Sequence, residues 1–203
     1  EIGVQTTNSD TIKEIDRVTN LEKLKQMVDQ IHSFQNIHQH LDLIAGLPYE
    51  GYESFIRSFN EVYAMHPNQL QLGFLKVLKG SKMYRNAEKY GIAYRNDPQY
   101  EVLFTKWLTH DELLSLKGVE EMVEVYYNSC QFTHTICALE QEFHQPFDLF
   151  LELAQYYERE GLRRQNHSRM ARFEILRQFI AQLGTGREQW YDEWMIYDLY
   201  LRE

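Results

Sequence analysis

The chain has 203 residues, of which 43% are hydrophobic, with only four prolines and ten glycines. This composition is typical of a globular protein with one ordinary domain or two small ones, and it excludes a disordered or collagen-like chain. The formal net charge is −9, from 21 basic and 30 acidic residues, so most of the surface should repel phosphate backbones. We therefore expect no nucleic-acid partner.

Hydrophobic runs are short, because charged residues such as Asp42 interrupt them. None approaches the roughly 20 apolar residues that a membrane helix needs, so we expect no membrane segment. No secretory leader is visible and two cysteines make no disulfide framework, which favours the cytoplasm. Glu1 falls inside a predicted strand, so we expect the sequence to be a piece of a longer protein.

The first 95 residues alternate strand-like and helical patterns, as in parallel βα units. Strands are predicted at about residues 1–5, 39–45 and 69–75. Helices are predicted at about residues 9–15, 21–34, 52–63 and 81–90, with Asn20 capping the second. We expect the three strands to pair in parallel and in sequential order, with helices on one face of the sheet.

After Pro98 the pattern becomes helical. Residues 100–107 are either a last strand or an irregular connector. Residues 109–127 are one helix, or two broken near Gly118, and further helices follow at 128–143, 147–160 and 168–183. In the tail, helical spacing forms a stripe of Trp190, Trp194, Tyr197 and Leu201, which favours buried core packing over an exposed groove for a partner. The predicted fold class is α/β followed by all-α, with domains at 1–97 and 98–203.

Three segments carry a family resemblance. Residues 1–8 (EIGVQTTN), followed by Arg17, resemble the E-x-G-x-Q-[ST] fourth strand of radical S-adenosylmethionine (radical SAM) enzymes. Residues 42–48 (DLIAGLP) and 75–81 (LKVLKGS) look like the fifth and sixth strands of their partial (βα) barrel. The resemblance is to the cobalamin-binding subgroup, which includes anaerobic magnesium-protoporphyrin IX monomethyl ester cyclase-like proteins. In one branch a helical domain of unknown function, similar to residues 100–203, follows the barrel.

The resemblance implies the C-terminal half of an iron–sulfur oxidoreductase or methyltransferase. Such an enzyme cleaves S-adenosylmethionine to a 5′-deoxyadenosyl radical that attacks a small-molecule substrate, in some cases with cobalamin as a second cofactor. The family holds its [4Fe-4S] cluster through Cys-x3-Cys-x2-Cys, which this chain lacks, so we expect no activity and no tight cosubstrate binding from this chain alone. The alternative is a non-catalytic helical protein-interaction module on a small α/β platform.

The resemblance also implies a cosubstrate site at the carboxyl ends of the strands, formed by Gln5, Arg17, Asp42, Ile44, Gly46, Leu75 and Val77. Gln5 would bind the ribose or carboxylate side, and Arg17 would reach the carboxylate. Ile44, Leu75 and Val77 would contact the adenine. For each residue an ordinary structural role remains open. The family has Gly where this chain has Asp42, and its Glu falls one place before Glu50, so we do not expect Glu50 to contact the ribose.

Asp42 is a carboxylate in the middle of an apolar strand, sharing one side of that strand with Ile44. Burying it is unfavourable unless it has a partner or meets water in a cavity.

Half a barrel would also expose a strand edge and its interior face. We therefore expect a homodimer formed through the α/β portion.

Two further patterns bear on function. Cys130, His134 and Cys137 are spaced for one helix face, but the first and last would lie on the order of 10 Å apart, so we expect buried cysteines and neither a metal site nor a disulfide. Arginines 163, 164, 169, 172 and 177 form a basic segment. We expect it to pair with the acidic residues of the tail, Glu188, Asp192, Glu193 and Asp198.

Overall fold

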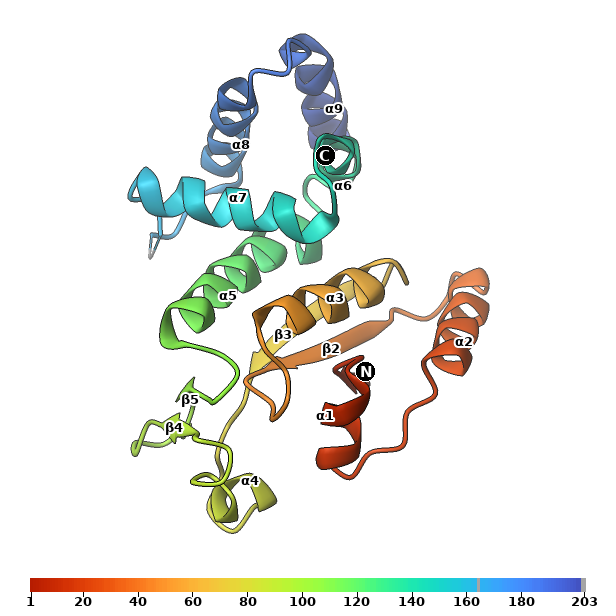
Figure 1. Cartoon of the computed structure of the whole chain (residues 1–203). Coiled ribbons are helices and arrows are strands. Elements are labelled where there is room, and N and C mark those ends of the chain that lie inside the picture. The colour runs from red at the N-terminus through yellow and green to blue at the C-terminus, as the bar shows by residue number, and fades with distance from the viewer. Residues whose placement is uncertain (164, 202–203) are drawn as a thin grey trace. The chain divides into compact units, whose positions relative to one another are not determined.

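A computed structural model describes residues 1–163 and 165–201 (Figure 1). The chain divides into two compact units, residues 1–120 and 121–203. Each unit is described by itself below. The domain boundary at residue 97 stays a prediction.

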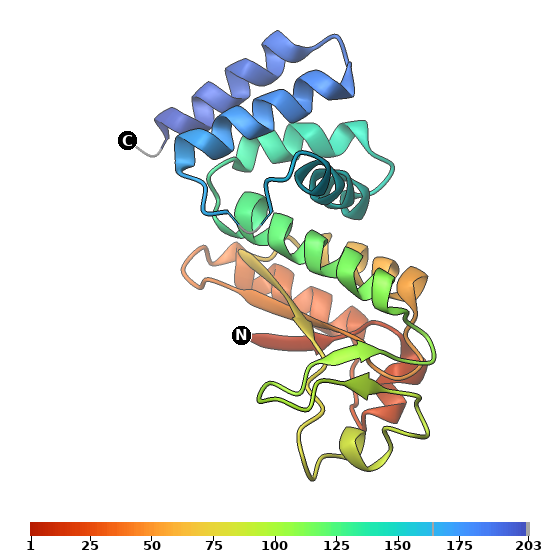
Figure 2. The same ribbon diagram turned by 90° about the vertical axis from the view of Figure 1, so that its left-hand side faces the viewer.

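Unit 1 contains a three-stranded parallel sheet, seen from the side in Figure 2. Its strands are β1 (Ile2–Gln5), β2 (His40–Ala45) and β3 (Gln69–Phe74), in the order β1-β2-β3. The connections carry helices α1 (Ser9–Glu14), α2 (Leu21–Ser33) and α3 (Tyr52–Tyr63). The side chain of Asn8 caps α1 and that of Asn20 caps α2. The predicted parallel, sequential arrangement is confirmed.

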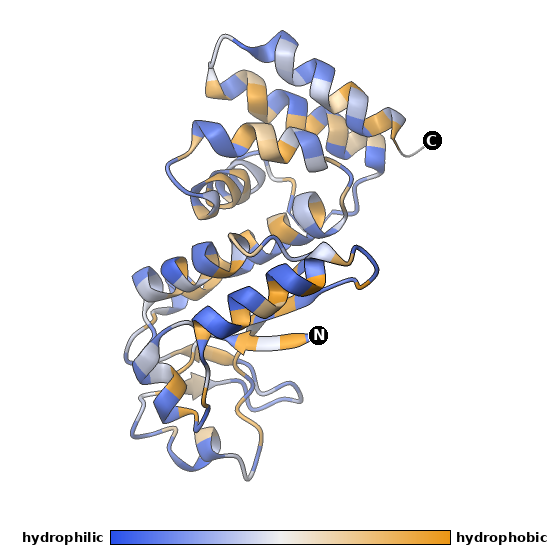
Figure 3. Ribbon diagram, turned by 90° about the vertical axis from the view of Figure 1, so that its right-hand side faces the viewer, coloured by the Kyte–Doolittle hydropathy of each residue, from blue (hydrophilic) through white to orange (hydrophobic). Residues whose placement is uncertain are grey.

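The two faces of the sheet differ in character. Leu41, Leu43 and Ala45 of β2 are buried, together with the apolar side of α3, which includes Phe55 and Phe59. The alternating residues of β2 are only half-buried. Figure 3 shows hydrophilic and hydrophobic positions interspersed along the helices. Helix α2 has hydrophobic residues at helical spacing, but only Val28 in that helix is buried.

The segment after β3 differs from the sequence prediction. Its helix α4 (Lys82–Arg85) has four residues and does not continue to Tyr90. Strands β4 (Ala93–Tyr94) and β5 (Val102–Phe104) then pair antiparallel in a separate two-stranded sheet. Gln99 and Tyr100 both have positive φ, at 106° and 48°, so the chain reverses direction before β5. Residues 102–104 are therefore a strand, but not a fourth strand of the parallel sheet.

Helices make up the rest of the described chain. Helix α5 (His110–Met122) passes through Gly118 without a break and continues as a π-helix, η1 (Val123–Asn128). The chain continues through α6 (Thr133–Leu139), the 3-10 turn η2 (Glu140–Glu142), α7 (Pro146–Arg159), α8 (Arg169–Leu183) and α9 (Glu188–Tyr200). Gly184, at φ +63°, ends α8 in the left-handed conformation. Among the described helices, none has the length and hydropathy to cross a membrane.

The predicted stripe of buried residues in α9 is wrong. The buried residues of this helix are Tyr191, Met195 and Asp198. Tyr197 and Leu201, from the predicted stripe, are 47% and 56% exposed. The buried face therefore lies beside the predicted stripe, on Tyr191 and Met195, and it includes the carboxylate of Asp198.

Candidate functional site

The candidate site lies on the face of the parallel sheet that carries Asp42 and Ile44, called here the open face. A pocket of about 360 Å³ lies on it, lined by Gln5, Asp42, Leu43, Ile44, Gln71, Gly73, Phe74, Leu75 and Lys76. Strands buried on both faces are usually almost entirely apolar. A carboxylate and two amides here therefore indicate a surface that meets polar groups.

The pocket brings together four of the seven predicted site residues. Gln5 comes from β1, Asp42 and Ile44 from β2, and Leu75 from the end of β3. Asp42 lies between Gly3 and Gln71 in the strand register, so the three strands present a continuous row of positions. Their roles in binding a ligand stay predictions.

Because Gly3 has no side chain, the side chains of Gln5 and Arg17 can lie close together beside it. A Cβ atom at Gly3 would lie 2.8 Å from Gln5 Nε2 and 3.6 Å from Arg17 Nη1. Arg17 Nη1 also donates a hydrogen bond to the carbonyl oxygen of Gly3, at 2.6 Å. Arg17 is exposed and does not line the pocket, but its guanidinium lies next to the amide of a residue that does.

Asp42 is the most unusual group in the pocket. Burial, and secondarily the neighbouring Glu1 carboxyl, raise the pKa of Asp42 above its usual range. Its Oδ1 is buried without a hydrogen-bond partner among the described residues. A buried oxygen without a donor is unfavourable, so this position would gain from a ligand that donates a hydrogen bond.

Gly46 and Val77 lie outside the pocket lining, and their roles in binding a ligand stay predictions. Both are buried. A Cβ atom at Gly46 would lie 2.8 Å from Val102 Cγ1. The Val77 amide donates to the Tyr100 carbonyl oxygen at 2.8 Å. These contacts hold the β5 segment against the ends of the strands.

Gly46→Ala should therefore destabilise unit 1 by about 2 kcal/mol, since φ at this position is +89° and the new methyl would overlap Val102. Urea unfolding measures the change. Gly80→Ala is the matched control, because φ there is +83° but nothing lies within 4 Å of the added Cβ atom. An equal loss in both variants would assign the whole effect to backbone conformation and contradict a packing role for Gly46.

Sequence reasoning did not anticipate the role of Glu50. This residue is 1% exposed, and its Oε1 accepts hydrogen bonds from the Thr6 hydroxyl at 2.6 Å and the Ser58 hydroxyl at 2.8 Å. Burial raises the pKa of Glu50 above its usual value. Glu50 thus joins the end of β1 to α3 beneath the surface, and the expectation that it is not a ribose contact stays untested.

The structure separates the three residues of the Cys130-His134-Cys137 pattern. Cys130 has φ +50° and precedes α6, so the predicted helix at 128–143 begins only at Thr133. The prediction of buried cysteines is also wrong, because Cys130 is half-buried and Cys137 is exposed. Among the described residues, no three His, Cys, Asp or Glu side chains are grouped to hold a metal ion. His134 instead binds the buried Asp198 through Nδ1, at 2.7 Å.

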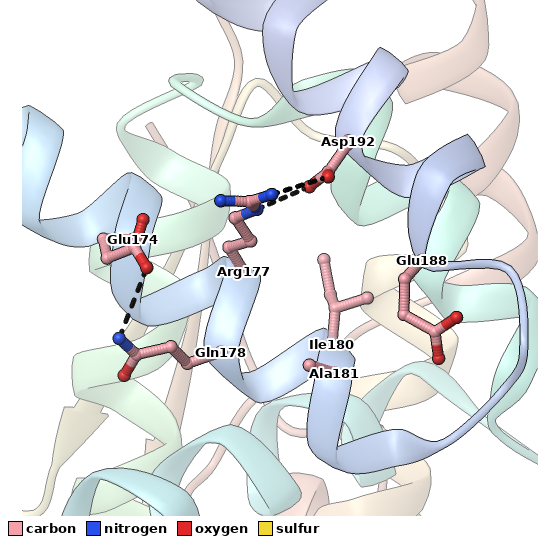
Figure 4. Close-up of a pocket in the computed structure, with 7 residues that line it drawn as sticks. All are labelled: Glu174, Arg177, Gln178, Ile180, Ala181, Glu188 and Asp192. Carbon is pink, nitrogen blue, oxygen red and sulfur yellow. Dashed lines mark hydrogen bonds and ion pairs between the residues drawn. The ribbon is translucent and has the colours of Figure 1, made fainter.

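A second pocket, of about 270 Å³, lies along α8 and α9 (Figure 4). Its one arginine, Arg177, donates two hydrogen bonds to Asp192, at 2.9 and 3.0 Å. This pair confirms the predicted contact between the basic segment and the acidic tail at Arg177. The prediction is wrong for Arg163, which pairs with Glu121 and Glu158, and Asp198 has partners in α6. Arg164 lies outside the described residues. The guanidinium of Arg177 is already paired, and the carboxylates of Glu174 and Glu188 also line this pocket. It is therefore a poor anion site.

Comparisons with known proteins identify two similarities. A stretch of 98 residues, 47% of this chain, is 34% identical to the oxygen-independent coproporphyrinogen-III oxidase-like protein HemZ of Bacillus subtilis (strain 168). That stretch covers 19% of HemZ, so the chain spans about a fifth of the length of this curated relative. Residues 88–203, more than half of the chain, match the family described as protein of unknown function DUF4080. The chain belongs to the DUF4080 family of proteins of unknown function.

Proposed function

We propose that this chain is part of a radical SAM iron–sulfur oxidoreductase, in which the open face binds the adenosine-bearing end of S-adenosylmethionine. The similarity to HemZ supports an oxidoreductase of this general kind. The parallel βα units support a barrel segment, since barrels place their sites at the carboxyl ends of such strands. The single observation that carries the proposal is the buried, unpartnered Oδ1 of Asp42 in a pocket that also contains Gln5 and Ile44.

The pocket fits part of an adenosine. Ile44 and Leu75 offer apolar contacts for a base, while Gln5 and Asp42 can hydrogen-bond to ribose hydroxyls. Arg17 can form a bidentate pair with a carboxylate. When bound at a cluster, the cosubstrate supplies radical chemistry. The residues present do not fit the cluster itself, because the chain has only two cysteines, 130 and 137. Cobalamin use remains a prediction from the resemblance.

Titration of S-adenosylmethionine into the full-length, cluster-loaded protein tests this proposal. Asp42→Ala should weaken binding roughly tenfold, because a donor on the ligand would lose its acceptor. Gln69→Ala is the control, since Gln69 lies on β3 outside the pocket lining. The isolated chain should bind only weakly, because a few hydrogen bonds worth roughly 1 kcal/mol each do not offset the entropy lost by the ligand.

Unchanged affinity in Asp42→Ala would contradict the adenosine site. It would leave the alternative of a helical interaction module on an α/β platform. One observation favours that alternative: Tyr197, Tyr200 and Leu201 of the α9 region are exposed, at 47%, 68% and 56%.

A further inference from the structure

Helix α1 ends in a turn that an aspartate closes in a conformation usually reserved for glycine. Asp16 has φ +56°, in the left-handed region. The next amide, of Arg17, donates back to the Ile12 carbonyl oxygen at 3.0 Å, and the Asp16 amide donates to Lys13 at 3.2 Å. This is the hydrogen-bond pattern with which helices end at a left-handed residue, most often glycine. Aspartate tolerates this conformation better than most residues but less well than glycine, so supporting contacts favour the turn.

Lys82 supplies those contacts. This residue begins α4, after β3, and its Nζ donates to Asp16 Oδ2 at 2.8 Å and to the Glu14 carbonyl oxygen at 2.5 Å. The Lys82 and Asp16 side chains are 34% and 75% exposed, so the pair lies at the surface, and the bond to the Glu14 carbonyl oxygen adds to its hold on the turn. Lys89 Nζ lies 3.4 Å from Glu14 Oε1, and the Tyr90 hydroxyl donates to the same oxygen. These donors lower the pKa of Glu14, the Tyr90 hydrogen bond most strongly.

The turn determines where Arg17 lies. Arg17 follows Asp16 directly, and its Nη1 reaches back to the Gly3 carbonyl oxygen at 2.6 Å. That contact places the guanidinium beside Gln5 on β1. Strand β1 pairs with β2, which carries Asp42. If Asp16 left the left-handed conformation, the chain would leave α1 in another direction and Arg17 would move away from Gly3.

We propose that Lys82 is a positioning residue for the ligand-binding arginine: by holding Asp16 in the left-handed turn, it fixes Arg17 where it can meet the carboxylate of the cosubstrate. The role of Arg17 in this inference rests on the proposed function, whereas the role of Lys82 rests on its contacts with Asp16 and Glu14. It couples the segment after β3 to the loop after β1, two βα units apart in sequence. It also explains why position 16 is an acidic residue, since glycine would form the turn but not the ion pair.

The test uses a rescue by glycine in the full-length protein. Lys82→Met should raise the exchange rate of the Arg17 amide hydrogen and weaken S-adenosylmethionine binding, each by roughly threefold, because the non-glycine turn loses a surface ion pair that supports it. The double variant Asp16→Gly with Lys82→Met should restore both, because glycine adopts the left-handed turn without strain. Lys13→Met is the control, since Lys13 is a lysine of α1 that contacts only Asp10, at 3.7 Å, among the ion pairs of the described residues.

Arg17→Met separates the inference from the proposed function. If Arg17→Met weakens cosubstrate binding but Lys82→Met changes neither exchange nor affinity, the positioning role is overturned and the proposed site stands. If Lys82→Met speeds exchange while Arg17→Met leaves affinity unchanged, Arg17 does not bind the cosubstrate and the proposed function fails at this residue. Failure of glycine to rescue the Lys82→Met variant would also overturn the inference.

Discussion

Replacement of Asp198 by alanine is expected to lower the free energy of unfolding of unit 2 by about 4 kcal/mol. This carboxylate of α9 is 4% exposed and accepts four hydrogen bonds from α6. Two come from the backbone amides of His134 and Thr135, at 3.1 and 2.8 Å. The others come from the His134 ring and the Thr135 hydroxyl, each at 2.7 Å. The residue before α6, Phe132, offers no side-chain cap, so Asp198 is the cap of this helix.

The measurement is urea unfolding followed by the fluorescence of Trp190 and Trp194, in a Trp107→Phe background that removes the remaining tryptophan. Asp192→Ala is the matched control on the same helix, because it removes a carboxylate paired with the exposed Arg177 at the surface. Asp198→Asn should lie between the two, since an amide oxygen can still accept. A loss no larger in Asp198→Ala than in Asp192→Ala would mean that the carboxylate does not cap α6.

The parallel sheet could be predicted from the sequence because its signals are local. Buried and half-buried positions alternate in β2. Asn8 caps α1, and Asn20 caps α2. These features need only a few neighbouring residues. The same holds for most of the helices, whose ends coincide with residues such as Ser168 and Gly184.

The failures come from interactions between residues distant in sequence. Asp198 and Thr135 are 63 residues apart, and no spacing rule connects an acidic residue in one helix to the first turn of another. The face that α9 buries follows this contact, and not the size of Trp190 and Trp194, which explains the wrong stripe. The turn at Cys130 likewise depends on a positive φ in a residue that seldom adopts it.

The candidate site was partly predictable. Period two places Asp42 and Ile44 on one face, and the family resemblance adds Gln5 and Leu75 from neighbouring strands; the structure brings all four to one pocket. Gly46 and Val77 could not be separated from them by sequence, because burial against Val102 and Tyr100 depends on the later β5 segment. Lys82 was not predicted either, since its partner Asp16 lies 66 residues earlier.

Glu50 should make the stability of unit 1 depend on pH. Burial raises its pKa, and the hydrogen bonds from Thr6 and Ser58 only partly oppose this. Because the folded-state pKa lies above the unfolded value, near 4.5, the neutral form favours folding. The contribution of Glu50 is therefore fully present below the unfolded pKa, and it is lost as the pH rises through the folded pKa.

Two substitutions separate charge from hydrogen bonding at this position. Glu50→Gln keeps an oxygen that can accept from Thr6 and Ser58, so it should preserve stability and remove this part of the pH dependence. Glu50→Ala should cost about 3 kcal/mol, because both buried hydroxyls lose their acceptor and a cavity remains.

Urea unfolding from about pH 4 to about pH 8, in a Trp190→Phe and Trp194→Phe background in which Trp107 reports on unit 1, measures both effects. Glu53→Ala is the control, since Glu53 is an exposed carboxylate of the same helix, α3, that Glu50 joins to β1. A stability of Glu50→Gln that falls with pH as steeply as that of the wild-type chain would show that another group titrates in this range. Stability that rises with pH in the wild-type chain alone would mean that Glu50 is held ionised in the fold, so that its hydrogen bonds from Thr6 and Ser58 outweigh the effect of burial.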